Sequence, residues 1–228
     1  MSTTRTMTEL HAGYDLRGER LAGLGGVAFG VILLLWLFQL LNSVPADDGS
    51  TQEWLAFMTE DPGVWVAYAL LVGIGLMAFL WCLASLRSIL ARAEGGAGRL
   101  STLVFGAGIL MVGLLAVSLA LIGATPIAAE FLAAFEADPH MGLLLIGAAG
   151  IVFPYAAMAG GVVAAAASVL ILRTNTFPRW FGWVSLVSGV AIFAAAIVDF
   201  TFLLLPVWTI VAGVLILTRA ETDAGLPT

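Results

Sequence analysis

Two short stretches of the sequence share an acidic and aromatic pattern and hold most of the residues that could do chemistry. Glu53-Trp54-Leu55-Ala56 is followed by Asp61-Pro62, and Glu130-Phe131-Leu132-Ala133 is followed by Asp138-Pro139 at the same spacing. Each copy lies between two long apolar runs. Carboxylates at such a boundary could bind a cation or a substrate. The candidate ligand-binding carboxylates are therefore Glu53, Asp61, Glu130 and Asp138.

The alternative for these carboxylates is a structural role at helix ends. Each copy predicts a helix of about ten residues with one aromatic and one acidic face, which fits the plane of a membrane surface. Asp61-Pro62 and Asp138-Pro139 then become N-cap carboxylates followed by proline at the first helical position. We expect two short interfacial helices, and the duplicated pattern indicates an internal repeat of a two-helix unit.

His140 is the one histidine close to these acidic residues. Together with Glu130, Asp138 and Asp199 it could bind a metal or catalyse hydrolysis. No HExxH pattern, nucleophile motif, phosphate loop or dinucleotide fingerprint accompanies it. A solvated histidine at a helix start is the alternative, and we assign no catalytic residue and no metal site.

Apart from His140 at the outer end of one run, the apolar runs contain no Arg, Lys, Glu or His. Proton-coupled pumps and intramembrane proteases need ionisable groups inside their spans, so both classes are disfavoured. Haem would need histidines there and retinal would need a lysine, and we therefore predict no cofactor. Asp199 is the borderline residue: it is either a turn or cap residue or a functional acid in an outward-facing cavity.

The composition identifies an integral membrane protein. The chain has 228 residues, of which 61% are hydrophobic and 11% charged, with a mean hydropathy of +1.05. Soluble domains carry about 25% charged residues. The single cysteine, Cys82, excludes a disulfide within the chain and is expected to be a small core residue.

The apolar runs predict an all-α fold, a bundle of six transmembrane helices arranged as three hairpins. A polar tail of residues 1–20 precedes a transmembrane domain of residues 21–219, and a tail of residues 220–228 follows. The predicted spans are residues 21–42, 62–86, 100–124, 139–172, 180–198 and 200–218. We expect Pro126 to turn the chain out of the third span into the second interfacial helix.

The arginines predict the orientation, because all nine basic residues are arginines and all fall on one side of a six-span arrangement. They are Arg5, Arg17, Arg20, Arg87, Arg92, Arg99, Arg173, Arg179 and Arg219. By the positive-inside rule, both termini are cytoplasmic. We expect a multi-pass protein of the plasma (inner) membrane of a prokaryote.

The fourth predicted span is longer than a bilayer requires and contains Pro154 among several glycines. Proline in mid-helix favours a kink, and small residues let neighbouring helices approach closely. We expect this helix to be the central and most contacted helix of the bundle. Many transporters instead build a site at a broken helix, which makes Pro154 and Tyr155 candidate ligand-binding residues.

The segment Phe177-Pro178-Arg179-Trp180-Phe181-Gly182-Trp183 carries a resemblance. It is similar to a Pro-Arg-Trp-Leu-Gly-Trp-like segment in a group of small six-helix bacterial membrane proteins, frequent in actinobacteria and classed as a domain of unknown function. Phe181 stands where leucine is usual. The resemblance implies the six-helix fold and no activity, so no functional residue is carried over.

Three functions stay open. The leading one is a non-enzymatic protein that acts through lateral helix contacts, as a partner subunit, scaffold or oligomer in contact with membrane lipids and not with nucleic acid. The second is a small permease or channel for a neutral or apolar solute, with a site near Pro154 and the outer acidic face. The third is an enzyme at the lipid surface that uses His140 and the outer carboxylates. The sequence leaves enzymatic activity undecided and favours its absence.

Overall fold

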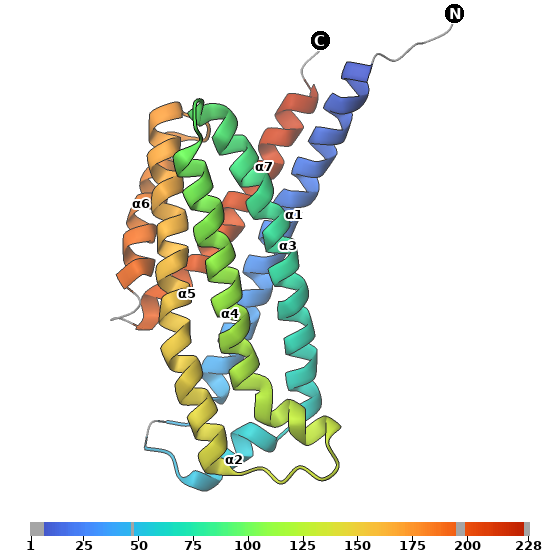
Figure 1. Cartoon of the computed structure of the whole chain (residues 1–228), viewed down its shortest axis with the longest axis vertical. Helices are drawn as coiled ribbons and strands as arrows, with labels where there is room; N and C mark the ends of the chain where they lie inside the picture. The colour runs from blue at the N-terminus through green and yellow to red at the C-terminus, as the bar shows by residue number, and fades with distance from the viewer. Residues whose placement is uncertain (1–6, 47, 195–198, 226–228) are drawn as a thin grey trace, which may run out of the picture.

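The computed structural model describes residues 7–46, 48–194 and 199–225, and every regular element in these ranges is a helix (Figure 1). The expected all-α fold is confirmed for this part of the chain. The elements are α1 (Met7–Ser43), α2 (Thr51–Thr59), α3 (Pro62–Glu94), α4 (Arg99–Phe131), α5 (Pro139–Thr174), α6 (Arg179–Phe193), η2 (Asp199–Leu203, a 3₁₀ helix) and α7 (Leu204–Gly225).

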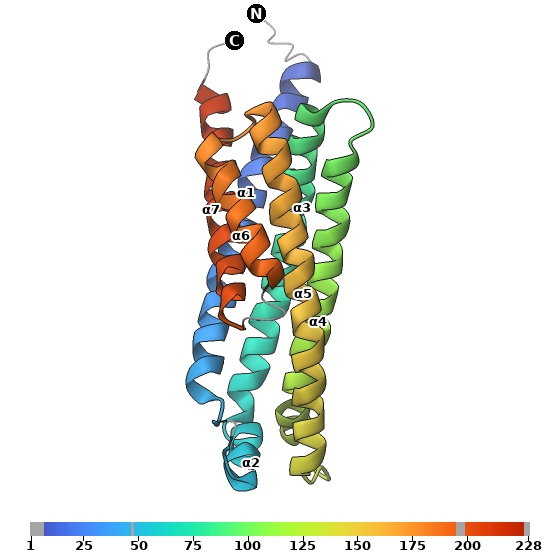
Figure 2. The same cartoon turned by 90° about the vertical axis from the view of Figure 1, so that its left-hand side faces the viewer.

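Four long helices, α1, α3, α4 and α5, run along the molecule, and α2 lies across one end (Figures 1 and 2). Helix α1 packs against α7 and α3, α3 against α4, α4 against α5, and α5 against α6. We call the end with α2 the acidic end, because its carboxylates are not balanced by any lysine or arginine in the described residues. The described acidic residues there are Asp48, Glu53, Glu60, Asp61, Glu130, Glu136 and Asp138.

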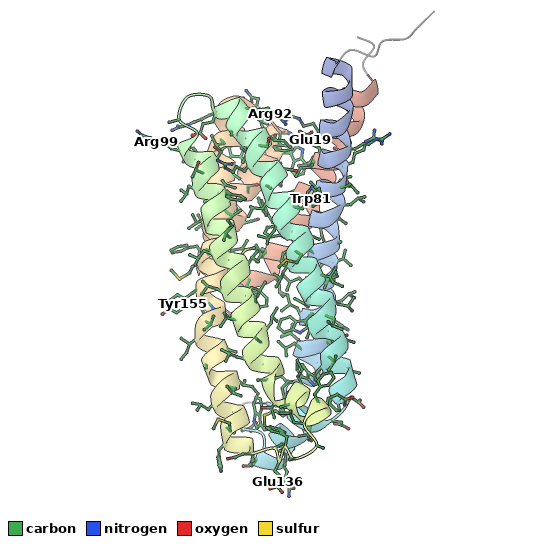
Figure 3. The ribbon with its side chains drawn as sticks, turned by 45° about the vertical axis from the view of Figure 1, so that its right-hand side comes forward. Glu19, Trp81, Arg92, Arg99, Glu136 and Tyr155 are labelled. Carbon is green, nitrogen blue, oxygen red and sulfur yellow. The ribbon has the colours of Figure 1, made fainter. Side chains whose placement is uncertain are left out.

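The opposite end, the arginine end, holds the start of α1, the end of α7 and the turns between α3 and α4 and between α5 and α6 (Figure 1). Arg92 of α3 forms an ion pair there with Glu19 of α1 (Figure 3). Glu94, at the end of α3, accepts hydrogen bonds at 2.9 Å from the backbone N–H groups of Leu100 and Ser101. These hydrogen bonds to the carboxylate satisfy the first backbone N–H groups of α4, which have no partner within the helix. The turn is therefore held by hydrogen bonds between the two helices that it connects.

Five helices are long and apolar enough to cross a membrane: Arg17–Ser43, Pro62–Glu94, Arg99–Phe131, Pro139–Thr174 and Thr201–Arg219. Helix α6 is apolar but has 15 residues, which span about 22 Å at 1.5 Å per residue. A bilayer core is about 30 Å thick. The chain is therefore a helical membrane protein with five full-length candidate spans and one shorter helix. The predicted fifth span is residues 180–198. Its last four residues, 195–198, lie outside the described part of the chain.

Several predicted spans were shorter than the observed helices, because a helix need not end where the membrane does. Residues 1–20 were expected to be a tail, but α1 begins at Met7. Helix α3 continues to Glu94 instead of stopping near residue 86, and it ends at Gly95, whose φ of 65° leaves the helical region. Glycine reaches this conformation without a steric cost, which makes it a common residue at helix C-termini.

The prediction of a second interfacial helix was wrong. Pro126 lies inside α4, which continues to Phe131, and the next seven residues contain no regular helix. The first copy of the pattern does form its own helix, α2, because Ser50 and Glu53 build a reciprocal capping box at its start. The second copy follows α4 without such a start, so Glu130 lies in the last turn of the long helix.

Helix α5 is the most buried of the candidate spans, as expected for a central helix: 67% of its most apolar stretch is buried, against 28–50% in the others. Its small residues allow backbone contact with α6. A Cβ added to Gly161 would lie 2.7 Å from the carbonyl oxygen of Gly189 and 2.7 Å from the backbone nitrogen of Phe193. These contacts place the C-terminal end of α6 beside Gly161, well short of the acidic end of α5.

Candidate functional site

The predicted site residues do not converge on one centre. Glu53 accepts a hydrogen bond from the backbone N–H of Ser50 at 2.8 Å, and Asp138 accepts one from His140 N–H at 2.9 Å. Both carboxylates therefore cap helices, as the structural alternative predicted for Asp138. Glu130 and the His140 side chain are exposed. Within the described residues, no group of three His, Cys, Asp or Glu side chains could hold a metal ion.

Tyr155 and Asp199 also contribute little to a shared centre. Tyr155 projects outward from α5 and is 57% exposed (Figure 3). The backbone of Asp199 begins η2, and its side chain lies outside the described part. Asp61 occupies the N-cap position of α3 with a φ of 50°, but its side chain makes no capping hydrogen bond. The prediction that Asp61 caps α3 with its carboxylate was therefore wrong.

Two of the predicted residues, Pro154 and Asp61, line separate cavities in the half of the bundle nearer the acidic end. Pro154 lines a lateral cavity of about 280 Å³ between α1, α4 and α5. Asp61 lines an acidic cavity of about 310 Å³ between α1, α2 and α3. A third, apolar cavity of about 240 Å³ lies between α3 and α4. Ligands could therefore bind in this half of the bundle, where the three cavities lie.

The lateral cavity exists because the α6–α7 hairpin is shorter than its neighbours. Helix α6 stops beside Gly161, and Figures 1 and 2 show α6 and the start of α7 ending well above the acidic end of α5. Phe202 of η2 covers the cavity on this side and meets Phe153 edge-to-face, with ring centroids 4.6 Å apart. Leu41 lines the cavity and is 55% exposed, so the cavity reaches the molecular surface.

Few polar groups line the lateral cavity, and two arise from prolines inside helices. Proline has no N–H, so the carbonyl group four residues earlier lacks its usual helical donor. For Pro154 that residue is Gly150, and for Pro126 it is Ile122, and both line the lateral cavity. Ser118 also lines it, but its hydroxyl donates to the Ala149 carbonyl at 3.1 Å. Two residues with a freed backbone carbonyl group therefore line this cavity.

Trp36 separates the three cavities and lines all of them. It is 5% exposed. Its indole N–H has no hydrogen-bond partner among the described side chains and backbone groups. The nitrogen is not among the fully enclosed polar atoms either, so it keeps some contact with open space.

The acidic cavity has a different chemistry from the other two. Four aromatic side chains line it, and Glu60 and Asp61 add carboxylates. Neither carboxylate has a hydrogen bond or ion pair to another described residue, in contrast to Glu53 and Asp138. The aromatic residues are Trp36, Phe57, Trp65 and Tyr68.

Sequence reasoning missed most of these lining residues. Glu60 stands next to Asp61, and that adjacency was an available signal for a paired acidic site. Trp36 and Trp65 had no such signal, because tryptophan near the end of an apolar run is typical of the membrane interface. Their meeting depends on how α1 packs against α3, which no spacing in the sequence encodes.

Comparison of the chain with protein-family models, with curated proteins and with solved structures gave no match. The resemblance of the residues 177–183 segment to a six-helix bacterial family therefore stays a prediction, and the function must be argued from the cavities themselves.

Proposed function

We propose that this membrane protein binds an apolar molecule from the bilayer, either a lipid chain or a neutral apolar solute, in the lateral cavity. The observation that carries the proposal is the cavity: about 280 Å³, lined mainly by aromatic and aliphatic side chains and open at the surface beside Leu41. Small-molecule sites are concave, mostly apolar and contain a few placed polar groups. The carbonyl groups of Gly150 and Ile122 are polar groups of that kind. A small permease for an apolar solute would use the same cavity.

A photoactivatable fatty acid tests this proposal. The protein is reconstituted in nanodiscs, the diazirine-bearing chain is activated, and the labelled peptides are mapped by mass spectrometry. We expect labelling on α1 near Leu41 and on α5 near Pro154. Labelling spread evenly over the exposed faces of all helices would contradict the proposal.

Two leucine substitutions on α5 sharpen the test. Gly150 lines the lateral cavity and Gly147 does not, and a Cβ added to either meets no atom within 4 Å. Leucine is a better helix former than glycine by about 0.5–1 kcal/mol, so both variants should fold. We expect Gly150→Leu to reduce labelling near Pro154 severalfold and Gly147→Leu to leave it unchanged. Equal labelling of the two variants would overturn the assignment of the cavity.

A second candidate function, lateral contact with another membrane helix, is supported by the outer face of α4. Gly106 and Gly113 lie on the same side of α4, about two turns apart, and both are exposed with no atom near an added Cβ. Small residues on such a face let a second helix approach closely. The protein would then act as a partner subunit, scaffold or oligomer. Gly113→Leu should release such a partner, which mass photometry in nanodiscs would detect.

We further propose that α6 and the residues after it form a sixth span, and that the arginine end faces the cytoplasm of a prokaryotic cell from its plasma membrane. The gathering of arginines at one end supports this orientation through the positive-inside rule. Both termini would then be cytoplasmic. The internal repeat rests on the sequence pattern alone, because only its first copy forms a separate interfacial helix.

A further inference from the structure

We propose that the acidic cavity binds an organic ammonium cation, a quaternary or protonated amine that also carries an oxygen acceptor. This site is separate from the lateral cavity, and the proposal does not rest on apolar ligand binding there. The acidic cavity lies at the acidic end, among residues of α1, of the C-terminal part of α2 and of the start of α3.

The aromatic walls are the first reason. Trp36, Phe57, Trp65 and Tyr68 line a space of about 310 Å³. Phe57 and Trp65 stand nearly perpendicular, at 86° with ring centroids 5.3 Å apart, so they form a corner. The face of an aromatic ring attracts a cation placed within about 6 Å of its centroid, and aromatic cages recognise quaternary ammonium groups in this way.

The carboxylates are the second reason. Glu60 and Asp61 line the same cavity, and neither is used for a hydrogen bond or an ion pair to another described residue. Gln39 and Ser43 also line it, and the Gln39 Nε2 group donates a hydrogen bond of 3.0 Å to the Ser43 hydroxyl oxygen. The cavity therefore offers two free negative charges beside the rings and, among its lining residues, no positive charge that would neutralise them.

The third reason is the indole N–H of Trp36. It belongs to a side chain that is 5% exposed, and it has no acceptor in the described part of the protein. A donor without a partner in the protein favours a ligand that carries a hydrogen-bond acceptor. Trp36 lines the acidic cavity, so a hydroxyl or carbonyl oxygen on the ligand brings an acceptor next to this side chain, while the ammonium group occupies the aromatic corner near the carboxylates.

The charge distribution of the whole molecule favours the same ligand class. The basic residues gather at the arginine end, whereas the acidic end carries seven described carboxylates. A concentration of one charge sign attracts ligands of the opposite sign and raises their local concentration. An anionic ligand would meet repulsion at this end.

Choline and its neutral isostere 3,3-dimethylbutan-1-ol test the proposal directly. The two have the same shape and hydroxyl group and differ in charge. Isothermal titration calorimetry with the full chain in phosphatidylglycerol nanodiscs should show saturable choline binding and about tenfold weaker binding of the isostere. Equal affinity for the two, or no saturable binding of choline, would overturn the proposal.

Variants of the cavity and matched controls locate the site. Glu60→Gln with Asp61→Asn should weaken choline binding about tenfold, whereas Glu136→Gln, a change at the same end outside the cavity (Figure 3), should not. Trp65→Leu should weaken binding similarly, while Trp81→Leu, on the same helix and outside the acidic cavity, should not. Cavity variants that bind as tightly as the controls would refute the assignment.

A lipid head group and a free solute share this ammonium chemistry. Repeating the titration in phosphatidylcholine nanodiscs separates the two sources. Loss of free choline binding there assigns the site to the lipid head group, and unchanged binding assigns it to a soluble amine. Both results support the ammonium site, provided that the neutral isostere binds more weakly.

Discussion

The contact between α5 and α6 gives a sharp prediction for Gly161→Ala. The added methyl group would lie 2.7 Å from the Gly189 carbonyl oxygen, 2.7 Å from the Phe193 backbone nitrogen and 2.8 Å from its Cβ. Two of these three atoms belong to the backbone, so relief requires α6 to move away from α5. The substitution therefore pushes α6, whose C-terminal end lies beside the lateral cavity, away from α5.

The expected change in the free energy of unfolding follows from two opposing effects. Overpacking a well-packed contact costs about 1–3 kcal/mol, and replacing glycine by alanine inside a helix returns about 0.5–1 kcal/mol. The net loss of unfolding free energy is therefore at most about 2.5 kcal/mol, and about 1–2 kcal/mol over the middle of these ranges. For a chain of this size, 1 kcal/mol shifts Tm by roughly 2–4 °C, so we expect Tm to fall by about 2–8 °C.

Thermal unfolding in nanodiscs, followed by intrinsic tryptophan fluorescence, measures this shift. Gly147→Ala is the matched control, because it lies on the same helix with open space around the added methyl group. It should leave Tm unchanged or raise it slightly. A Gly161→Ala protein as stable as the Gly147→Ala protein would refute the close backbone approach of α5 and α6.

Three further predictions concern polar contacts and helix ends. Ser185→Ala removes the acceptor of the Trp208 indole N–H, a buried hydrogen bond of 2.8 Å; the loss should cost about 1–3 kcal/mol, and Ser185→Thr should restore part of the stability in the same melting assay. Ser50→Ala removes the capping box of α2 and should cost about 0.5–2 kcal/mol, detected as faster amide exchange in residues 51–56; unchanged exchange would contradict the capping role. Pro154→Ala returns a donor to the Gly150 carbonyl and should slow amide exchange around residues 150–154 about fivefold, which corresponds to about 1 kcal/mol for one hydrogen bond.

Local signals in the sequence predicted the helix starts well. Pro62 and Pro139 each follow an aspartate and stand at the first helical position, where a missing N–H costs nothing. Pro126 follows Thr125, which is also a residue type that can cap a helix, but it stands at the end of a long apolar run and Thr125 is buried. There the helix continues and gives up one hydrogen bond, so the predicted turn does not form.

The cavities could not be predicted because they depend on helix length and on contacts between distant segments. The lateral cavity requires α6 to end beside Gly161, and the apolar pattern after residue 179 gives no sign of that end. The acidic cavity requires Phe57 of α2 to meet Trp65 of α3, which depends on the turn at Glu60 and Asp61. Asp61 has a left-handed backbone there, a conformation that few non-glycine residues adopt and that spacing does not reveal.

The shortness of α6 also sets how the protein meets its lipid environment. An apolar helix of about 22 Å is shorter than a bilayer core of about 30 Å, and such a difference is relieved by local thinning of the bilayer or by tilting. On the side of α6 the adjacent leaflet must thin, or its chains must fill the lateral cavity that α6 leaves open, while the opposite side of the molecule, covered by α3 and α4, fits a full bilayer. The protein therefore has a thick and a thin flank, so it should prefer boundaries between membrane regions of different thickness and bend the bilayer around it.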